Sequence, residues 1–131
     1  MDSNRELAKY RINSANEILA DAKLLYDHDS YNSSASRSYY AMFNALRAIL
    51  ALDGRDFKKH SAVISYFQRE YIKTRTFDAE ISDFVRTAFA IRSDTDYQDF
   101  FEVSAEDAKR QIDNAAEVIS AVTEYLHRHF D

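Results

Sequence analysis

A charged residue interrupts an apolar helical stripe in the segment FAIRSDTDYQDF, which spans residues 89–100. Helical spacing places Arg92 where the neighbouring members of the stripe are apolar. Asp96 follows one helical turn later, and Tyr97 comes directly after it. As an exposed ion pair, Arg92 and Asp96 would contribute about 0.3 kcal/mol, whereas a buried pair needs further hydrogen bonds. The segment is therefore either a structural ion pair or a polar site that could bind phosphate.

Four polar residues form a second line, on a helix expected after residue 30. Their spacing of three, four and three residues places them on one side of that helix, beside its apolar stripe. They are Arg37, Tyr40, Asn44 and Arg47. The line could bind a ligand, or it could serve only to fix the pairing of two helices.

The basic segment KKHS supplies the cations Lys58 and Lys59 and an ionisable side chain, His60. Histidine titrates near neutral pH, so His60 is the candidate for an acid-base group in this part of the chain. Alternatively, His60 is a cap or a surface residue near the start of a helix. Lys58, Lys59 and His60 are counted here among the candidate ligand-binding residues.

Patterns for metal, cofactor and nucleophile sites are incomplete in this sequence. The run EYLH, residues 124–127, matches one Glu-x-x-His element of di-iron bundles, but no second copy accompanies it. Gly54 is the only glycine, so the glycine-rich phosphate loop and the dinucleotide-binding fingerprint are both missing. Cysteine is also missing, which excludes disulfides and thiolate ligands. We therefore predict no metal and no cofactor.

The composition favours long helices. The chain has 131 residues with no proline and one glycine, and these are the residues that most often interrupt helices. No segment shows the sustained alternation of a strand. We therefore expect one all-α domain over residues 1–131, an up-and-down bundle of four long helices and one short helix.

Capping signals divide the chain into five helices. The first expected helix is capped by Ser3 and Glu6 and ends before residues 26–32, and the second is capped by Asp29 or Ser30 and ends before Gly54. A shorter third helix covers about residues 58–73. The fourth helix is capped by Asp78, and the fifth starts at Ser104 and runs through Leu126. On the first helix, the expected apolar face contains Leu7, Arg11, Ala15, Ile18, Ala22 and Leu25. No apolar run is long enough to span a membrane and no signal-peptide core is present, so we expect a cytoplasmic protein.

Charge is unevenly distributed along the chain. The net charge of -5 argues against a general nucleic-acid coat, which would need many cations. Residues 53–75 nevertheless carry six Lys or Arg against three acids, while residues 78–107 carry two against nine. One surface could therefore attract phosphate while another repels it.

Three segments together resemble the stand-alone HEPN-domain proteins, named for nucleotide binding in higher eukaryotes and prokaryotes. They are SRSYYAMFNALRAILAL (residues 36–52), FKKHSAVISYFQREYIKT (57–74) and IRSDTDYQDF (91–100). The resemblance implies a helical bundle that commonly forms a homodimer. It also implies a partner, a minimal nucleotidyltransferase encoded nearby, with which such proteins often act as a toxin-antitoxin pair.

Catalytic members of that family are metal-independent RNases that use an Arg followed four to six residues later by His. In this chain Arg92 matches the motif arginine and Ser93 the polar residue that often follows it, but Tyr97 stands where His is expected. An ordinary tyrosine, with a pKa near 10, is a poor general base at neutral pH. Asp96 and Tyr97 could still help Arg92 to bind phosphate.

Three hypotheses follow for the function of the chain. The first is a non-catalytic or weakly active HEPN homodimer that works with a nucleotidyltransferase and binds RNA or nucleotide. The second is a metal-independent endoribonuclease that uses Arg92 and Tyr97, assisted by His60. The third is a plain helical interaction module.

Overall fold

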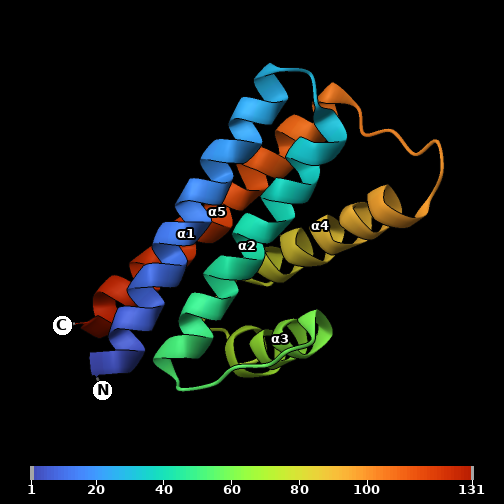
Figure 1. The fold of residues 1–131 in the computed structure, drawn as a ribbon. Coiled ribbons are helices and arrows are strands. Elements are labelled where there is room, and N and C mark those ends of the chain that lie inside the picture. Colours follow the sequence, from blue (N-terminus) through green and yellow to red (C-terminus); the bar gives the residue numbers. More distant parts are fainter. Residues whose placement is uncertain (1, 131) are drawn as a thin grey trace.

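The computed structural model describes residues 2–130, which fold into helices joined by short connections (Figure 1). The elements are α1 (Asp2–Asp27), α2 (Tyr31–Leu52), α3 (His60–Phe67), η1 (Gln68–Ile72), α4 (Ala79–Tyr97) and α5 (Ala105–Phe130). No strand occurs in residues 2–130. The predicted all-α bundle is therefore confirmed.

Helix α2 is the central element of the bundle, and α1, α4 and α5 pack around it (Figure 1). Its apolar side chains are almost fully buried because neighbours lie on several sides; they include Tyr39, Met42, Leu46, Ile49 and Leu50. Across the described residues no helix is long and apolar enough to cross a membrane.

The face that α1 presents to the core agrees with the expected one at Arg11, Ala15 and Ala22 and differs from it at Leu7. Its buried seam alternates four and three residues apart and consists of Ala8, Ile12, Ala15, Leu19 and Ala22. Leu7, expected to be buried, is 41% exposed. Alanine at three of the five seam positions lets the α1 backbone approach its neighbours closely. Arg11 is buried as expected, beside this seam.

The capping predictions had mixed outcomes. Helix α1 begins at Asp2, so Ser3 lies inside the helix and the predicted cap is wrong. Ser30 and Asp78 occupy N-cap positions, but their side chains make no capping hydrogen bond. At α5 the prediction is confirmed, because the Asp107 backbone N–H donates to Ser104 Oγ at 3.1 Å. Gly54 ends the second helix in the left-handed conformation, with φ of 70°.

The predicted third helix, over about residues 58–73, is split in the structure. Helix α3 begins at His60 and passes into the π-helical turn η1, where the Lys73 N–H donates to the Gln68 carbonyl five residues back at 3.0 Å. Within this turn Tyr71 and Ile72, consecutive residues, are both buried, and Tyr71 stacks on Phe67 with ring centres 5.6 Å apart. The wider turn is thus associated with burial of two adjacent side chains.

An asparagine fixes the connection between α4 and α5. Asn32, in the first turn of α2, donates to the Phe101 carbonyl at 2.9 Å and accepts from the Val103 N–H at 2.8 Å. Val103 packs beside Ala35 and Ala108 in a small satellite core. The chain between α4 and α5 is therefore attached to the start of α2.

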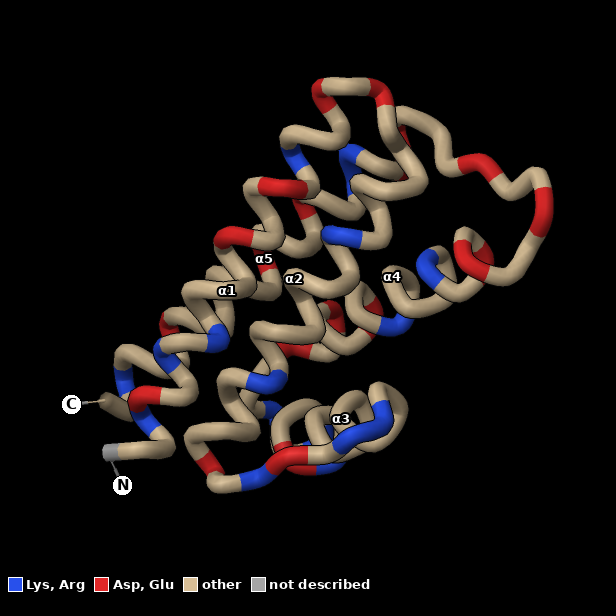
Figure 2. Tube along the Cα trace, viewed as in Figure 1, with Lys and Arg blue, Asp and Glu red and all other residues tan. Residues whose placement is uncertain are grey.

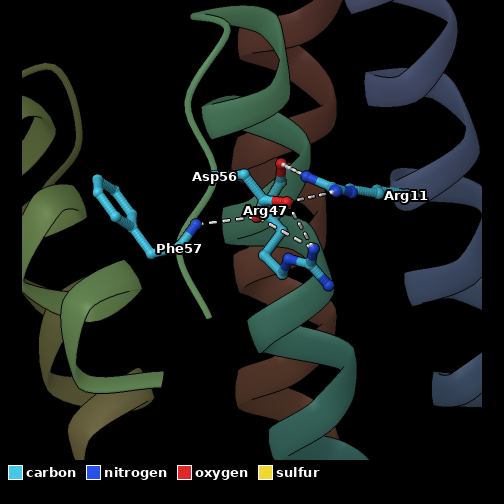
Figure 3. A network of polar contacts seen from close by, with 4 residues as sticks. All are labelled: Arg11, Arg47, Asp56 and Phe57. Atoms are coloured by element: carbon cyan, nitrogen blue, oxygen red, sulfur yellow. Dashed lines mark hydrogen bonds and ion pairs between the residues drawn. The ribbon is translucent and has the colours of Figure 1, made fainter. Parts of the chain in front are cut away.

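A buried arginine holds the connection between α2 and α3 (Figure 3). Arg11 is 9% exposed; it donates to the Arg47 carbonyl at 3.2 Å and lies 3.5 Å from Asp56 Oδ2. Arg47 donates to both oxygens of Asp56, at 3.1 and 3.3 Å, and Asp56 Oδ1 accepts from the Phe57 N–H at 3.0 Å. The carboxylate thereby joins α1, α2 and the loop that leads to α3.

Asp56 is stabilised as the ionised form in this network. Burial opposes its ionisation, but the hydrogen bond from Arg47 and the charges of Arg47 and Arg11 outweigh burial and lower the pKa of Asp56. A group with a lowered pKa in the folded state contributes stability above its unfolded pKa and loses that contribution as pH falls.

We predict that Asp56→Asn lowers the free energy of unfolding by about 1 kcal/mol at pH 7, because it leaves buried Arg11 without its carboxylate. The difference from the wild type should begin to shrink as pH falls below about 4, the ordinary value for Asp, and should disappear once pH is below the lowered pKa that Asp56 has in the folded chain. Urea denaturation followed by circular dichroism measures both values. Asp83→Asn is the control, since Asp83 makes an exposed ion pair with Arg86 at 3.0 Å. Equal effects of the two substitutions at pH 7 would contradict the prediction.

Candidate functional site

Arg92 reaches from α4 to α2, where it contacts Tyr40. Its Nη2 donates to Tyr40 Oη at 2.8 Å, and its guanidinium carbon lies 5.4 Å from the centre of the tyrosine ring. Asp96 Oδ2 lies 3.0 Å from Arg92 Nε, but this N–H is not directed at the carboxylate and makes no hydrogen bond. The contact is therefore an ion pair. The side chain of Arg92 is 22% exposed and that of Asp96 is 40% exposed, so an anion from solvent can approach this charge.

His60 lies beside the same group, at the first residue of α3. Its Nδ1 is 2.7 Å from Tyr39 Oη, and its ring stacks on Phe43 with centres 4.0 Å apart and planes inclined by 22°. The Tyr40 ring meets the imidazole edge-on, with centres 6.0 Å apart. Tyr40 therefore contacts both His60 and Arg92 and joins them into one cluster.

The environment of Tyr39 determines which nitrogen of His60 carries the proton. Tyr39 is fully buried, and this burial raises its pKa, so the phenol keeps its proton. Among residues 2–130 the Tyr39 hydroxyl has one hydrogen-bond partner, His60 Nδ1, and we assign the phenol as the donor because a buried hydroxyl proton needs an acceptor. Since Nδ1 accepts that hydrogen bond, a neutral His60 carries its proton on Nε2. Burial, and then the charges of Arg92 and Arg47, lower the pKa of His60 below its ordinary value of 6.5. His60 is accordingly a neutral imidazole with an Nε2–H donor at pH 7.

Tyr97, the residue at the position of the family histidine, lies at the exposed end of α4. Tyr97 is 81% exposed, although it directly follows Asp96, the ion-pair partner of Arg92.

 Arg92, by comparison, is held against α2 and is mostly buried. Ser93, the next residue after the arginine, is half-buried. The structure therefore brings Arg92 and Asp96 together, while Tyr97 faces solvent.

The polar line predicted on α2 divides into two groups. Arg37 lies with its guanidinium carbon 5.7 Å from the centre of the Tyr40 ring, and Asn44 donates to the Tyr40 carbonyl at 2.9 Å. These residues belong to the surroundings of Arg92. Arg47 instead binds Asp56 in the network that holds the α2 to α3 connection.

Lys58 and Lys59 are exposed in the segment that precedes α3, and Lys59 occupies the N-cap position.

Sequence reasoning missed Tyr39 and Phe43 as parts of the site, because both fall on the buried stripe of α2. The tyrosine doublet was the available signal. Adjacent helical residues point about 100° apart, so one ring can enter the core while the other stays at its edge.

The cluster has the properties of an anion-binding site. Arg92 supplies a positive charge, Tyr40 holds the guanidinium in place, and His60 offers a neutral N–H donor. Residues 2–130 contain no group of three or more His, Asp or Glu side chains arranged to hold a metal ion. The geometry is suited to binding phosphate through fixed donors and one cation.

The chain is thus an all-α helical bundle with an arginine-centred polar cluster between α2, α3 and α4. Residues 8–125 match the model of the HEPN domain, and the chain belongs to the HEPN family. This confirms the resemblance noted in the sequence.

Relatives cover nearly the full chain. A UPF0332 protein of Thermotoga maritima is 32% identical over 126 residues, which is 96% of each chain. A protein of Methanocaldococcus jannaschii that bears the name "Putative toxin MJ0142" is 32% identical over 122 residues, covering 93% of this chain and 82% of its own. A UPF0332 protein of Gloeobacter violaceus is 32% identical over 113 residues, covering 86% of this chain and 90% of its own.

We predict that Arg92→Gln raises the pKa of His60, because the positive charge of Arg92 disfavours protonation of the imidazole. An NMR titration of the His60 ring protons measures this pKa. Arg37→Gln is the control, since it removes a cation from the same region that does not lower the pKa of His60. An unchanged or lower pKa in the Arg92 variant would show that the two groups are not electrostatically coupled.

Proposed function

We propose that this chain is a homodimeric HEPN protein that binds RNA or nucleotide through Arg92, has weak or no catalytic activity, and acts with a minimal nucleotidyltransferase in a toxin-antitoxin-like pair. Family membership over residues 8–125 supports the general assignment. The names of two relatives from Methanocaldococcus jannaschii contain the word toxin, which is consistent with such a pair.

The hydrogen bond between Tyr39 and His60 is the observation that carries the proposal of weak activity. RNA cleavage through the 2'-hydroxyl needs a general base with a free lone pair close to that hydroxyl. In the cluster, Nδ1 of His60 is engaged by the Tyr39 hydroxyl, and with that hydroxyl assigned as the donor the imidazole proton lies on Nε2. His60 can therefore donate a hydrogen bond to a phosphate but has no free nitrogen to accept a proton.

Tyr97 does not replace the missing base. It stands at the position of the family histidine, and an ordinary phenol is protonated at neutral pH. Arg92 remains available to neutralise a phosphate, because both it and Asp96 are partly exposed. A site with a cation and donors but no base favours binding over cleavage.

The second candidate function is a metal-independent endoribonuclease. The observation that favours it is the closeness of a neutral histidine to an arginine, which is a combination that can perform acid-base catalysis on phosphate esters. For this candidate to hold, His60 would have to exchange tautomers and give up the hydrogen bond from Tyr39.

Cleavage of RNA in the presence of EDTA separates the two candidates. We predict that the purified wild-type chain leaves RNA intact and that Tyr97→His, which puts an imidazole at the exposed end of α4 five residues after Arg92, cleaves it detectably. Adding Arg92→Ala to Tyr97→His should remove the gain. Cleavage by the wild type that Arg92→Ala abolishes would instead establish the endoribonuclease.

Partnership with a nucleotidyltransferase is tested by co-expression. We predict that a nucleotidyltransferase encoded beside this chain co-purifies with it, and that light scattering of the chain alone shows a dimer at micromolar concentration. The same purification with an unrelated nucleotidyltransferase is the control. A monomer, or failure of the neighbouring protein to co-purify, would contradict the corresponding part of the proposal.

A further inference from the structure

A second cationic hollow lies where α3, η1 and α4 meet, apart from the Arg92 cluster. It has a volume of about 320 Å³ and is lined by Ile64, Ser65, Gln68, Arg69, Lys73 and Arg86. Three of these six residues are cations and none is acidic. A hollow whose only charged lining residues are positive is suited to an anion.

The polar groups in the hollow are available as donors. Gln68 accepts a hydrogen bond from Ser82 through Oε1, so its amide nitrogen is left to donate elsewhere. Arg69 pairs with Glu70 at 3.1 Å and Arg86 with Asp83 at 3.0 Å. Both ion pairs are exposed and hence weak, so a phosphate can compete with the carboxylates.

The π-helical turn forms one wall of this hollow. The hydrogen bond that defines the turn runs from the Lys73 N–H to the Gln68 carbonyl, at 3.0 Å, and both of these residues line the hollow. Single π-helical turns are rare and are frequent at functional sites. The backbone irregularity and the cationic lining thus occur at the same place.

The hollow and the Arg92 cluster occupy different positions along α4. Arg86 precedes Arg92 by six residues on α4, which is a rise of about 9 Å and about a third of a turn around the helix. Two phosphates of a single oligonucleotide could occupy the two positions. A mononucleotide could occupy only one.

The charge distribution favours approach from the side of α3. Cations concentrate in residues 53–75, while acidic residues follow the connection from α4 to α5 (Figure 2). An RNA strand bound at Arg92 would be repelled by that connection and attracted toward α3 and η1.

We propose that the hollow lined by Arg69, Lys73 and Arg86 is a second phosphate subsite for single-stranded RNA bound at Arg92. This inference rests on the proposed function, that Arg92 binds RNA or nucleotide. It specifies the ligand further, as an RNA oligomer that spans both positions.

Fluorescence anisotropy with a labelled ten-nucleotide oligouridine, measured at several salt concentrations, tests the subsite. The variant Arg69→Gln/Lys73→Gln/Arg86→Gln should bind at least about 10-fold more weakly, and the slope of log K against log salt should fall by about 0.7, since the subsite holds one phosphate of a single strand. Arg86→Gln alone should weaken binding and lower the slope by less than the triple variant does, and it serves if the triple variant does not fold.

The matched control is Lys23→Gln/Lys109→Gln/Arg110→Gln, which removes the same charge. Lys109 and Arg110 make exposed ion pairs with Asp113 and Asp107, each at 2.8 Å, much as Arg86 does with Asp83. This control should keep the wild-type slope. Equal losses in the two triple variants would overturn the subsite, because they would show a general effect of charge.

Uridine monophosphate and Arg92→Ala distinguish failure of the subsite from failure of the proposed function. The monophosphate should be sensitive to Arg92→Ala and insensitive to the triple substitution in the hollow. If Arg92→Ala weakens RNA binding and the hollow variant does not, the subsite alone is wrong. If the wild type binds neither probe, RNA or nucleotide binding at Arg92 is wrong and the subsite is rejected with it.

Discussion

The burial of the Arg11 guanidinium is the constraint on which the geometry of the site depends. A buried charge is costly unless it is paired, and Arg11 finds its carboxylate at Asp56, 45 residues later in the chain. Because Arg47 binds the same carboxylate, the connection from α2 to α3 is drawn back onto α1 and α2. That path brings His60, four residues after Asp56, to the rings of Tyr39 and Phe43. A contact far from Arg92 thus helps to determine what stands beside Arg92.

Two consecutive tyrosines of α2 determine the hydrogen-bonding properties of His60 and Arg92. Tyr39 points into the core and donates to His60, whereas Tyr40 stays at the edge of the core and accepts from Arg92. The first contact fixes the proton of a neutral His60 on Nε2, and the second holds a cation close by. The resulting cluster has a positive charge and a hydrogen-bond donor but no free base. This arrangement favours binding a phosphate over activating a hydroxyl.

The sequence was sufficient to predict the helices, the Arg92 and Asp96 pair and the family, because these depend on local spacing and on motifs. It did not reveal contacts between distant segments, since these leave no periodic signal: Arg11 with Asp56, Tyr39 with His60, and Ser82 with Gln68. Leu7 was expected on the buried face of α1 in place of Ala8, because both residues are apolar and only packing distinguishes them. The π-helical turn likewise follows from tertiary packing of Tyr71 and Ile72. The functional roles of Arg92, His60 and Tyr97 stay predictions.

The most direct test of this account is the protonation of His60 at neutral pH, observed in a long-range proton-nitrogen NMR spectrum of the folded chain. The account predicts a neutral ring with the proton on Nε2 and an unprotonated Nδ1, and predicts that Tyr39→Phe removes this strict preference. A ring protonated on Nδ1, or a doubly protonated ring at pH 7, would contradict it. Either result would leave His60 with a proton arrangement compatible with catalysis and would favour the endoribonuclease.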